Sequence, residues 1–264
     1  MPETIGVDPE ALRADVREKY RDVALHPDGE FHFHTGRPLA SLLGYPSGIV
    51  DGLPDRAVES FAGVGNPFSV RPLQRGARVV DFGSGGGFDC FVAAQAVGAG
   101  GRVVGVDVTP EMLAKANRTA EELGLDNVEF RCGLLEDVPV EDGWADVVLS
   151  NGVINLCADK AVVFAEAFRI LRPGGSLQFA DIANGQPLPE AAVCEIDLWT
   201  GCIAGGLPVD DWCAVIEGAG FDDISVSLSV DAFGGSGGER NARAYDVAAH
   251  VFLAHRPTDA TAGA

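Results

Sequence analysis

Short apolar runs rich in β-branched residues alternate with helix-like segments from about residue 77 to residue 256. Each run is nearly continuously apolar, as expected for strands that a parallel sheet buries on both faces. This alternation predicts an α/β fold with a Rossmann-like, doubly wound sheet. The runs that carry the prediction are residues 77–82, 102–107, 128–132, 145–150 and 176–181.

Helix signals fill the spaces between these runs. Thr109, Pro110 and Glu111 supply a hydroxyl cap, a proline at the first helical position and an acid in the first turn, and Gly124 ends this helix. The other expected elements are a helix from near residue 160 to the Pro-Gly-Gly turn at 173–175, helices that start at 188 and 208, strands at 224–230 and 247–253, and a glycine-rich surface loop at 233–238.

The first 75 residues lack a strand alternation strong enough to join this sheet. We expect a helix over residues 9–23, followed by an irregular segment that carries His26, His32 and His34. The expected division is a helical cap and substrate segment over 1–75, a cofactor-binding domain over 76–257 and a disordered tail over 258–264.

The cofactor in that division, S-adenosylmethionine (SAM), is indicated by the glycine-rich segment 81–87. The segment follows the first strand and opens a helix, as a nucleotide-binding loop does. Its glycines allow positive φ and a close ligand approach, which would serve a dinucleotide equally well. Asp81, before the glycines, and Asp107, at the end of the second strand, favour SAM because a pyrophosphate disfavours nearby carboxylates. Asp107 is expected to bond both ribose hydroxyls, and the alternative is that it caps the following helix.

Four segments resemble the class I SAM-dependent methyltransferases, and in particular their arsenite methyltransferase branch. They are residues 81–90, 105–112, 150–156 and 201–206, and the similarity covers about residues 75–256. The first two segments are shared by many methyltransferases, whereas the last two look specific to this branch. The resemblance implies a seven-stranded sheet with an antiparallel last strand, and SAM across the carboxyl ends of the first two strands.

The residues and the resemblance together define an expected SAM site. Asp81 would meet the methionine amine, the glycine loop would lie under the ribose, and residues 133–136 would enclose the adenine. The resemblance adds Tyr20, which would cover the SAM carboxylate. The expected cofactor-binding residues are Tyr20, Asp81, Gly83, Ser84, Gly85, Gly87, Asp107, Val108, Met112, Leu135, Glu136 and Asn151.

The acceptor site departs from the branch that the chain resembles. Arsenite methyltransferases hold trivalent arsenic through three cysteine thiolates, of which only Cys202 has a counterpart at a matching position. Gly152 stands at the second position, and residues 1–75 contain no cysteine. A thiophilic centre prefers thiolates to oxygen or imidazole ligands. We therefore expect a small organic metabolite, methylated on oxygen, nitrogen or carbon, as the substrate.

Two alternatives stay open. One is a methyltransferase of arsenite, another metalloid or a thiol that uses Cys202 with Cys157 or Cys213. The other belongs to a different class, a SAM-binding protein that does not methylate, because fold does not fix function.

An organic acceptor needs a base to remove a proton during methyl transfer. His32 and His34 would point the same way along an extended segment, with Arg37 beside them. The alternative is that both histidines are structural, hydrogen-bonded residues. The expected catalytic residues are His32, His34, Asn151 and Cys202.

The composition excludes several kinds of partner. A net charge of −20 and a pI near 4.4 disfavour nucleic acids and anionic membranes, which attract cationic surfaces. No secretory signal and no run of about 18 apolar residues is present, so we expect a cytoplasmic protein, monomeric or homodimeric. The six cysteines form no CxxC pair, and a histidine site would need Glu30 or His26 as a third ligand, so no metal is expected.

Overall fold

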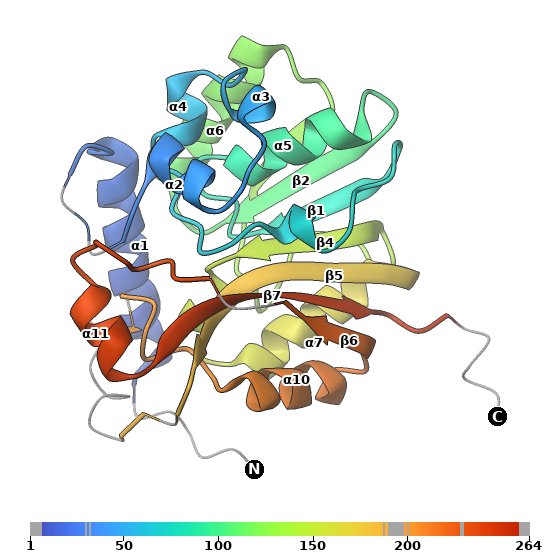
Figure 1. The fold of residues 1–264 in the computed structure, drawn as a ribbon. Coiled ribbons are helices and arrows are strands. Elements are labelled where there is room, and N and C mark those ends of the chain that lie inside the picture. Colours follow the sequence, from blue (N-terminus) through green and yellow to red (C-terminus); the bar gives the residue numbers. More distant parts are fainter. Residues whose placement is uncertain are drawn as a thin grey trace.

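A seven-stranded sheet forms the centre of the protein (Figure 1). The computed structural model describes residues 7–29, 31, 33–186, 188–189, 198–199, 201–227 and 230–258. The strand order is β3-β2-β1-β4-β5-β7-β6, and only β7 runs antiparallel to its neighbours β5 and β6. This confirms the expected Rossmann-like sheet with an antiparallel last strand.

The sheet contains β1 (Arg78–Phe82), β2 (Arg102–Asp107), β3 (Val128–Cys132), β4 (Ala145–Asn151), β5 (Leu171–Asn184), β6 (Asp222–Val226) and β7 (Val247–His255). The helices are α1 (Pro9–Leu25), α2 (Gly36–Leu42), α3 (Ser47–Val50), α4 (Asp55–Val58), α5 (Phe88–Val97), α6 (Pro110–Leu123), α7 (Lys160–Ile170), α10 (Val209–Gly218) and α11 (Glu239–Ala244). Two 3-10 turns, η1 (Pro67–Ser69) and η2 (Ile154–Leu156), precede β1 and α7.

Element boundaries differ from the expectation at three places. The helix before β5 ends at Ile170, and the Pro-Gly-Gly turn at 173–175 lies inside β5, as an irregularity between Leu171, which pairs with Ala145, and Ser176, where regular pairing begins. β6 begins at Asp222 and ends at Val226, earlier than the expected strand at 224–230. The helix expected from residue 188 falls mostly on residues outside the described ranges.

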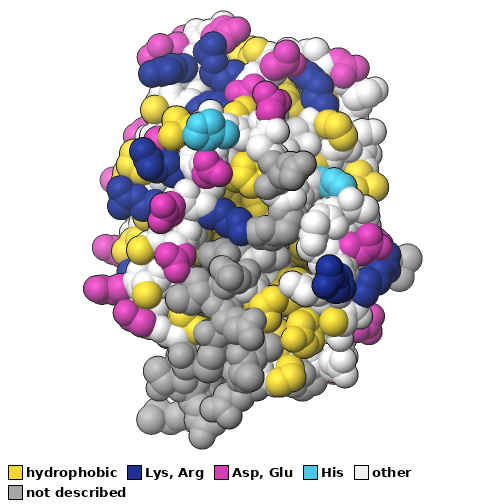
Figure 2. Space-filling view, turned by 90° about the vertical axis from the view of Figure 1, so that its left-hand side faces the viewer, with side chains coloured by type: hydrophobic (Ala, Val, Ile, Leu, Met, Phe, Trp, Pro, Cys, Tyr) yellow, Lys and Arg dark blue, Asp and Glu magenta, His cyan; other side chains and the backbone are white. Residues whose placement is uncertain are grey.

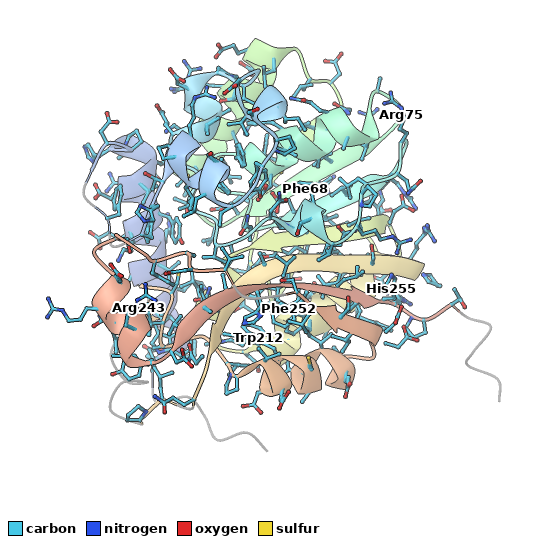
Figure 3. The ribbon with its side chains drawn as sticks, in the orientation of Figure 1. Phe68, Arg75, Trp212, Arg243, Phe252 and His255 are labelled. Carbon is cyan, nitrogen blue, oxygen red and sulfur yellow. The ribbon has the colours of Figure 1, made fainter. Side chains whose placement is uncertain are left out.

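Two helical layers cover the sheet. α7 and α10 pack on one face, where Trp212 is fully buried and its ring lies 6.1 Å from that of Phe252 (Figure 3). Phe252 in turn stacks on Phe179 of β5, with ring centroids 4.6 Å apart. α5 and α6 cover the other face (Figure 1). None of the helices in the described part of the chain is long and apolar enough to cross a membrane.

The N-terminal segment divides into two structural parts. Residues of α2, α3 and the following turn, Leu39, Leu43 and Leu53 among them, are buried against Phe88 and Phe91 of α5 and so belong to the core. α1 instead lies across the carboxyl ends of the parallel strands and contacts α6 (Figure 1). α1 therefore covers the edge of the sheet where Rossmann-like folds bind their ligands.

The Arg256 side chain closes the C-terminal end of α7. Its Nη1 donates to the carbonyl oxygens of Phe168 at 2.7 Å and Leu171 at 2.6 Å, and its guanidinium lies 4.5 Å from the Phe168 ring. A cation that satisfies the last carbonyls of a helix also complements the helix dipole.

We predict that Arg256→Ala lowers the free energy of unfolding by about 1.5 to 3 kcal/mol, the range for losing hydrogen bonds to a charged group. Urea denaturation followed by circular dichroism measures this. Arg118→Ala, at an exposed position of α6, is the control and should change stability by less than about 0.5 kcal/mol. Equal stability of the two variants would contradict the assigned role of Arg256.

Candidate cofactor and acceptor site

A large pocket lies between α1 and the carboxyl ends of β1, β2 and β4. It encloses about 1140 Å³ of empty space, part of it open to solvent. Eleven of the twelve expected cofactor residues line it. They are Tyr20, Asp81, Gly83, Ser84, Gly85, Asp107, Val108, Met112, Leu135, Glu136 and Asn151.

α1 forms the outer wall of this pocket through Leu12, Arg13, Val16 and Tyr20. Arg13 pairs with Glu136 at 3.2 Å, beyond β3, and Arg21 pairs with Glu111 of α6 at 2.9 Å. Figure 2 views the molecule from this side and shows Lys and Arg side chains among Asp and Glu side chains. Exposed ion pairs contribute little free energy each, so α1 is also held by apolar packing of residues such as Val23 against Met112.

The glycine loop between β1 and α5 has room for a ligand at one glycine and is closely packed at two others. A Cβ on Gly85, which has φ +51°, would meet only the Met112 sulfur at 4.0 Å. A Cβ on Gly83 would lie 2.5 Å from the Val153 side chain, so this glycine allows β1 to approach the turn after β4. Ser84 lines the pocket, but its Oγ is buried, lies 2.7 Å from where a Cβ on Gly105 would stand and has no hydrogen-bond partner in the described structure.

Gly87 does not line the pocket, contrary to the expectation. It caps α5 with φ +89°, and a Cβ there would lie 2.8 Å from Phe130 and 2.9 Å from Phe91. Helix packing and the backbone conformation therefore require a glycine at position 87. The motif alone could not separate this role from ligand binding.

Asp107, at the end of β2, faces the pocket and also supports the backbone around it. Its Oδ2 accepts from the Gly85 amide at 2.9 Å, and its Oδ1 accepts from the Thr109 amide at 2.8 Å. Desolvation raises the pKa of this carboxyl, and the bonds from Thr109 and Gly85 oppose the rise. Asp107 therefore holds the turn before α6 and the glycine loop in one arrangement, and its bonds to a ribose stay a prediction.

Two further carboxylates, Asp81 and Asp89, line the same pocket and are almost fully buried. Cys90 Sγ donates to Asp81 Oδ2 at 3.2 Å. Burial is the main cause that raises the pKa of Asp81 well above its usual value, and the nearby Asp89 adds to the rise. Burial also raises the pKa of Asp89 to about 6, although bonds from Tyr45 and Asn151 oppose it.

Asn151, at the end of β4, joins the N-terminal segment to the sheet. Its Oδ1 accepts from the amides of Val64 at 2.8 Å and Gly65 at 3.1 Å. Its Nδ2 lies within hydrogen-bonding distance of the Gly65 carbonyl at 2.9 Å, Asp89 Oδ2 at 3.0 Å and the Tyr45 hydroxyl at 3.1 Å. Because these contacts use its whole carboxamide, Asn151 is placed to position the pocket wall rather than to act on an acceptor.

Cys202 and Cys157 lie near the α1 side of the pocket. Cys202 does not line the pocket; it is 4% exposed, has φ +58° and lies within hydrogen-bonding range of the Tyr20 hydroxyl, which does. Cys157 is half-buried and lines the pocket itself. Burial raises the pKa of each thiol to about 12. Cys213, on α10, does not line the pocket.

Neither His34 nor Arg37, two residues of the expected acceptor site, lines the pocket. His34 Nε2 lies 2.9 Å from the Gly234 carbonyl oxygen, so this ring contacts the glycine-rich loop before α11. Arg37 bonds the carbonyl oxygens of Val50 at 2.6 Å and Leu53 at 2.7 Å. These contacts give His34 and Arg37 structural positions. His32 lies outside the described residues.

Sequence reasoning missed three residues that the pocket depends on. Asp89 belongs to the glycine motif, and the acid in the first turn of α5 was the available signal. Tyr45 and Arg13 reach the site from distant parts of the chain, and no local pattern marks them. No group of three or more His, Cys, Asp or Glu side chains in the described ranges is arranged to hold a metal ion.

The comparisons with known proteins agree with this geometry. Residues 73–220 match a family model described as a methyltransferase domain. The arsenite methyltransferase of Halobacterium salinarum is 39% identical over 234 residues, which cover 83% of this chain and 60% of that protein. That of Aquipseudomonas alcaligenes is 44% identical over 158 residues, covering 57% of this chain and 46% of that protein. The chain thus spans about half the length of these curated relatives.

A solved structure extends the similarity to three dimensions. The arsenic (III) S-adenosylmethionine methyltransferase of Chlamydomonas reinhardtii superimposes with a TM-score of 0.67 at 30% identity. The match covers 85% of this chain and 75% of that one. The sheet order, the glycine loop and these relatives together establish that the chain belongs to the class I SAM-dependent methyltransferases.

Proposed function

We propose that the protein transfers the methyl group of SAM to a trivalent arsenical bound at the Cys202 side of the pocket. The observation that carries this proposal is a thiol, Cys202, beside Tyr20 of the pocket wall, in a chain whose relatives are named arsenite methyltransferases. Membership of the family does not by itself identify the acceptor. The organic acceptor expected from the sequence is the second candidate.

The pocket offers complementary groups for each part of SAM. Asp107 would accept hydrogen bonds from the ribose hydroxyls, and Leu135 would pack against the adenine. Asp81 would meet the methionine ammonium at the other end. SAM supplies an already activated methyl group, so the protein has mainly to align the acceptor and exclude water.

The conformation of Cys202 supports a role for its thiol. A non-glycine residue with φ +58° is strained, and such strain gathers at functional sites. Glycine would relieve the strain, yet a cysteine occupies the position. Burial and the nearby Asp181 raise the pKa of the Cys202 thiol, so this thiol would lose its proton only as an As–S bond forms.

The chemistry of the acceptor also favours arsenic over an organic metabolite. The arsenic lone pair would form the As–C bond while the C–S bond breaks and its electron pair goes to sulfur, which oxidises As(III) to As(V). No proton leaves the acceptor, so no general base is required. An oxygen or nitrogen acceptor would need one, and no histidine belongs to the described pocket lining.

The number of thiols limits which arsenical fits. Trivalent arsenic forms three bonds, and the candidates in this chain are Cys202 and Cys157. Two protein thiolates would leave one position for an organic group or an external thiol. A methylated arsenical or a thiol complex is therefore a better-matched acceptor than free arsenite.

One observation favours the organic acceptor. A Cβ on Gly152, where the resemblance expects a cysteine, would lie 3.1 Å from Val64 Cγ1. An apolar side chain thus occupies the space beside that position. Incubation with SAM and arsenite, a methylated arsenical or a panel of organic metabolites decides between the two, because S-adenosylhomocysteine (SAH) forms only with a true acceptor. A protein that binds SAM but forms SAH with none of them would support a non-methylating role.

We predict that Asp107→Asn weakens SAM binding by about 1.5 to 3 kcal/mol, because charge-assisted bonds to two hydroxyls are lost. Isothermal titration calorimetry measures the change. Asp137→Asn, on the segment after β3 and outside the pocket lining, is the control. Unchanged affinity in Asp107→Asn would mean that the carboxylate serves only the backbone around Gly85 and Thr109.

We predict that Cys202→Gly lowers the rate of arsenical methylation by more than about 100-fold, equivalent to about 2.7 kcal/mol. Its free energy of unfolding should stay within about 1 kcal/mol of the wild type, because relief of the positive φ offsets the lost thiol packing. Cys213→Ser, outside the pocket lining, should retain the wild-type rate. Wild-type turnover in a folded Cys202→Gly protein would remove this thiol from the mechanism.

A further inference from the structure

Three carboxylates of the pocket, those of Asp81, Asp89 and Asp107, have no ion-pair partner among the described residues. Asp81 and Asp89 are 2% and 6% exposed, and Asp107 is half-buried beside them. No salt bridge between described residues reaches any of the three carboxylates. A buried carboxylate must be paired, hydrogen-bonded or protonated. The arrangement therefore favours a ligand that brings positive charge.

The three carboxylates differ in what holds them. Asp107 accepts from backbone amides, and Asp81 accepts from the weakly donating Cys90 thiol. Asp89 is bonded to the Tyr45 hydroxyl at 2.6 Å and to Asn151 Nδ2 at 3.0 Å. Of the three, Asp89 is therefore the carboxylate that is connected, through Asn151, to residues 61–65 of the N-terminal segment, called the wall below.

We propose that Asp89 is a specificity residue that favours the sulfonium of SAM over the neutral sulfur of SAH and that links this charge to the position of residues 61–65. The inference rests on the SAM site of the proposed function and does not depend on the acceptor. SAM and SAH share the adenosine, the ammonium and the carboxylate, and they differ by one methyl group and one positive charge at sulfur. A carboxylate near the methionine end of the pocket feels that difference directly.

The link to the wall runs through Asn151. Phe61, Ala62 and Gly63 line the pocket, and the amides of Val64 and Gly65 donate to Asn151 Oδ1. A Cβ on Gly63 would lie within 2.4 Å of the Asn151 amide, so this wall packs directly on the network. An ionised Asp89 accepts from both Tyr45 and Asn151. A protonated Asp89 gives up part of that accepting capacity, which weakens the hold on the wall.

The charged and titratable groups around Asp89 define the expected pH dependence. Asp81 of β1 lies beside it, Tyr45 faces it from the turn after α2, Cys90 follows it on α5, and Asp107 acts on Asp81 from β2. The pKa of Asp89 is about 6. A cationic ligand binds the ionised form better, so its affinity should rise as the pH increases through this value. Ionisation of Asp81 and Asp107 also increases the affinity for a cationic ligand as the pH rises. A variant that lacks the Asp89 carboxylate shows how much of the increase these two residues cause.

The test measures the binding of SAM, sinefungin and SAH by calorimetry between about pH 5 and about pH 8. Sinefungin carries an ammonium in place of the sulfonium and matches the charge of SAM without a transferable methyl group. For the wild type, the SAM to SAH affinity ratio should rise about tenfold or more across this range, and the sinefungin to SAH ratio should follow it. Asp89→Asn should flatten both ratios while retaining SAH binding.

Tyr45→Phe provides an independent variant. It keeps the carboxylate but removes a bond that lowers the pKa of Asp89, so the midpoint of the SAM to SAH ratio should move to higher pH. If Asp89→Asn fails to fold, this shift carries the test. A folded Asp89→Asn protein with the wild-type pH dependence, or a midpoint unchanged in Tyr45→Phe, would overturn the proposal.

Hydrogen exchange tests the link to the wall. The amides of Val64 and Gly65 should exchange more slowly with SAM than with SAH, and Asp89→Asn should remove the difference. Equal exchange in the two wild-type complexes would overturn the link. A wild-type protein that binds none of the three ligands would instead refute the SAM site itself, which distinguishes that failure from this one.

Discussion

Asp81 and Asp89 are buried in one pocket with no ion-pair partner among the described residues, and burying two carboxylates in this way costs free energy. Hydrogen bonds from Cys90, Tyr45 and Asn151 stabilise the ionised carboxylates in part. Burial outweighs these bonds and keeps the pKa of both carboxyls above its usual value. A ligand with positive charge completes the balance. The glycine loop, by leaving open space at Gly85, allows such a ligand to approach the backbone.

The N-terminal segment contributes to the pocket in two distinct ways. Residues 61–65 are held by Asn151 at the end of β4, and α2 and α3 are buried against α5, so this part is a fixed wall. α1 crosses the open side and is held by two ion pairs at its rim and by apolar contacts around Val23. A deletion through residue 40 would therefore cut into the core, whereas a deletion that ends before residue 28 would remove α1 alone.

The sequence predicted the sheet and most of the cofactor pocket because both follow from local patterns. Parallel strands place their carboxyl ends together, so Asp81 and Asp107 could be assigned to one site from their strand-end positions. Gly87 shows the limit, since helix packing and ligand binding demand the same residue type. Tyr45 meets Asp89 across 44 residues of sequence, and His34 meets Gly234 across 200. Such contacts depend on how the N-terminal segment packs, which no periodicity records.

In the proposed mechanism the reacting methyl group lies between the carboxylates of Asp81 and Asp89 and the thiol of Cys202. A crystal structure of the protein with SAH and a methylated trivalent arsenical, with diffraction data collected at the arsenic absorption edge, tests this most directly. We expect the ribose to bond Asp107, the sulfur of SAH to lie near Asp89 and an anomalous arsenic peak to lie within bonding distance of Cys202 Sγ. An arsenic peak elsewhere, or a cofactor outside this pocket, would contradict it.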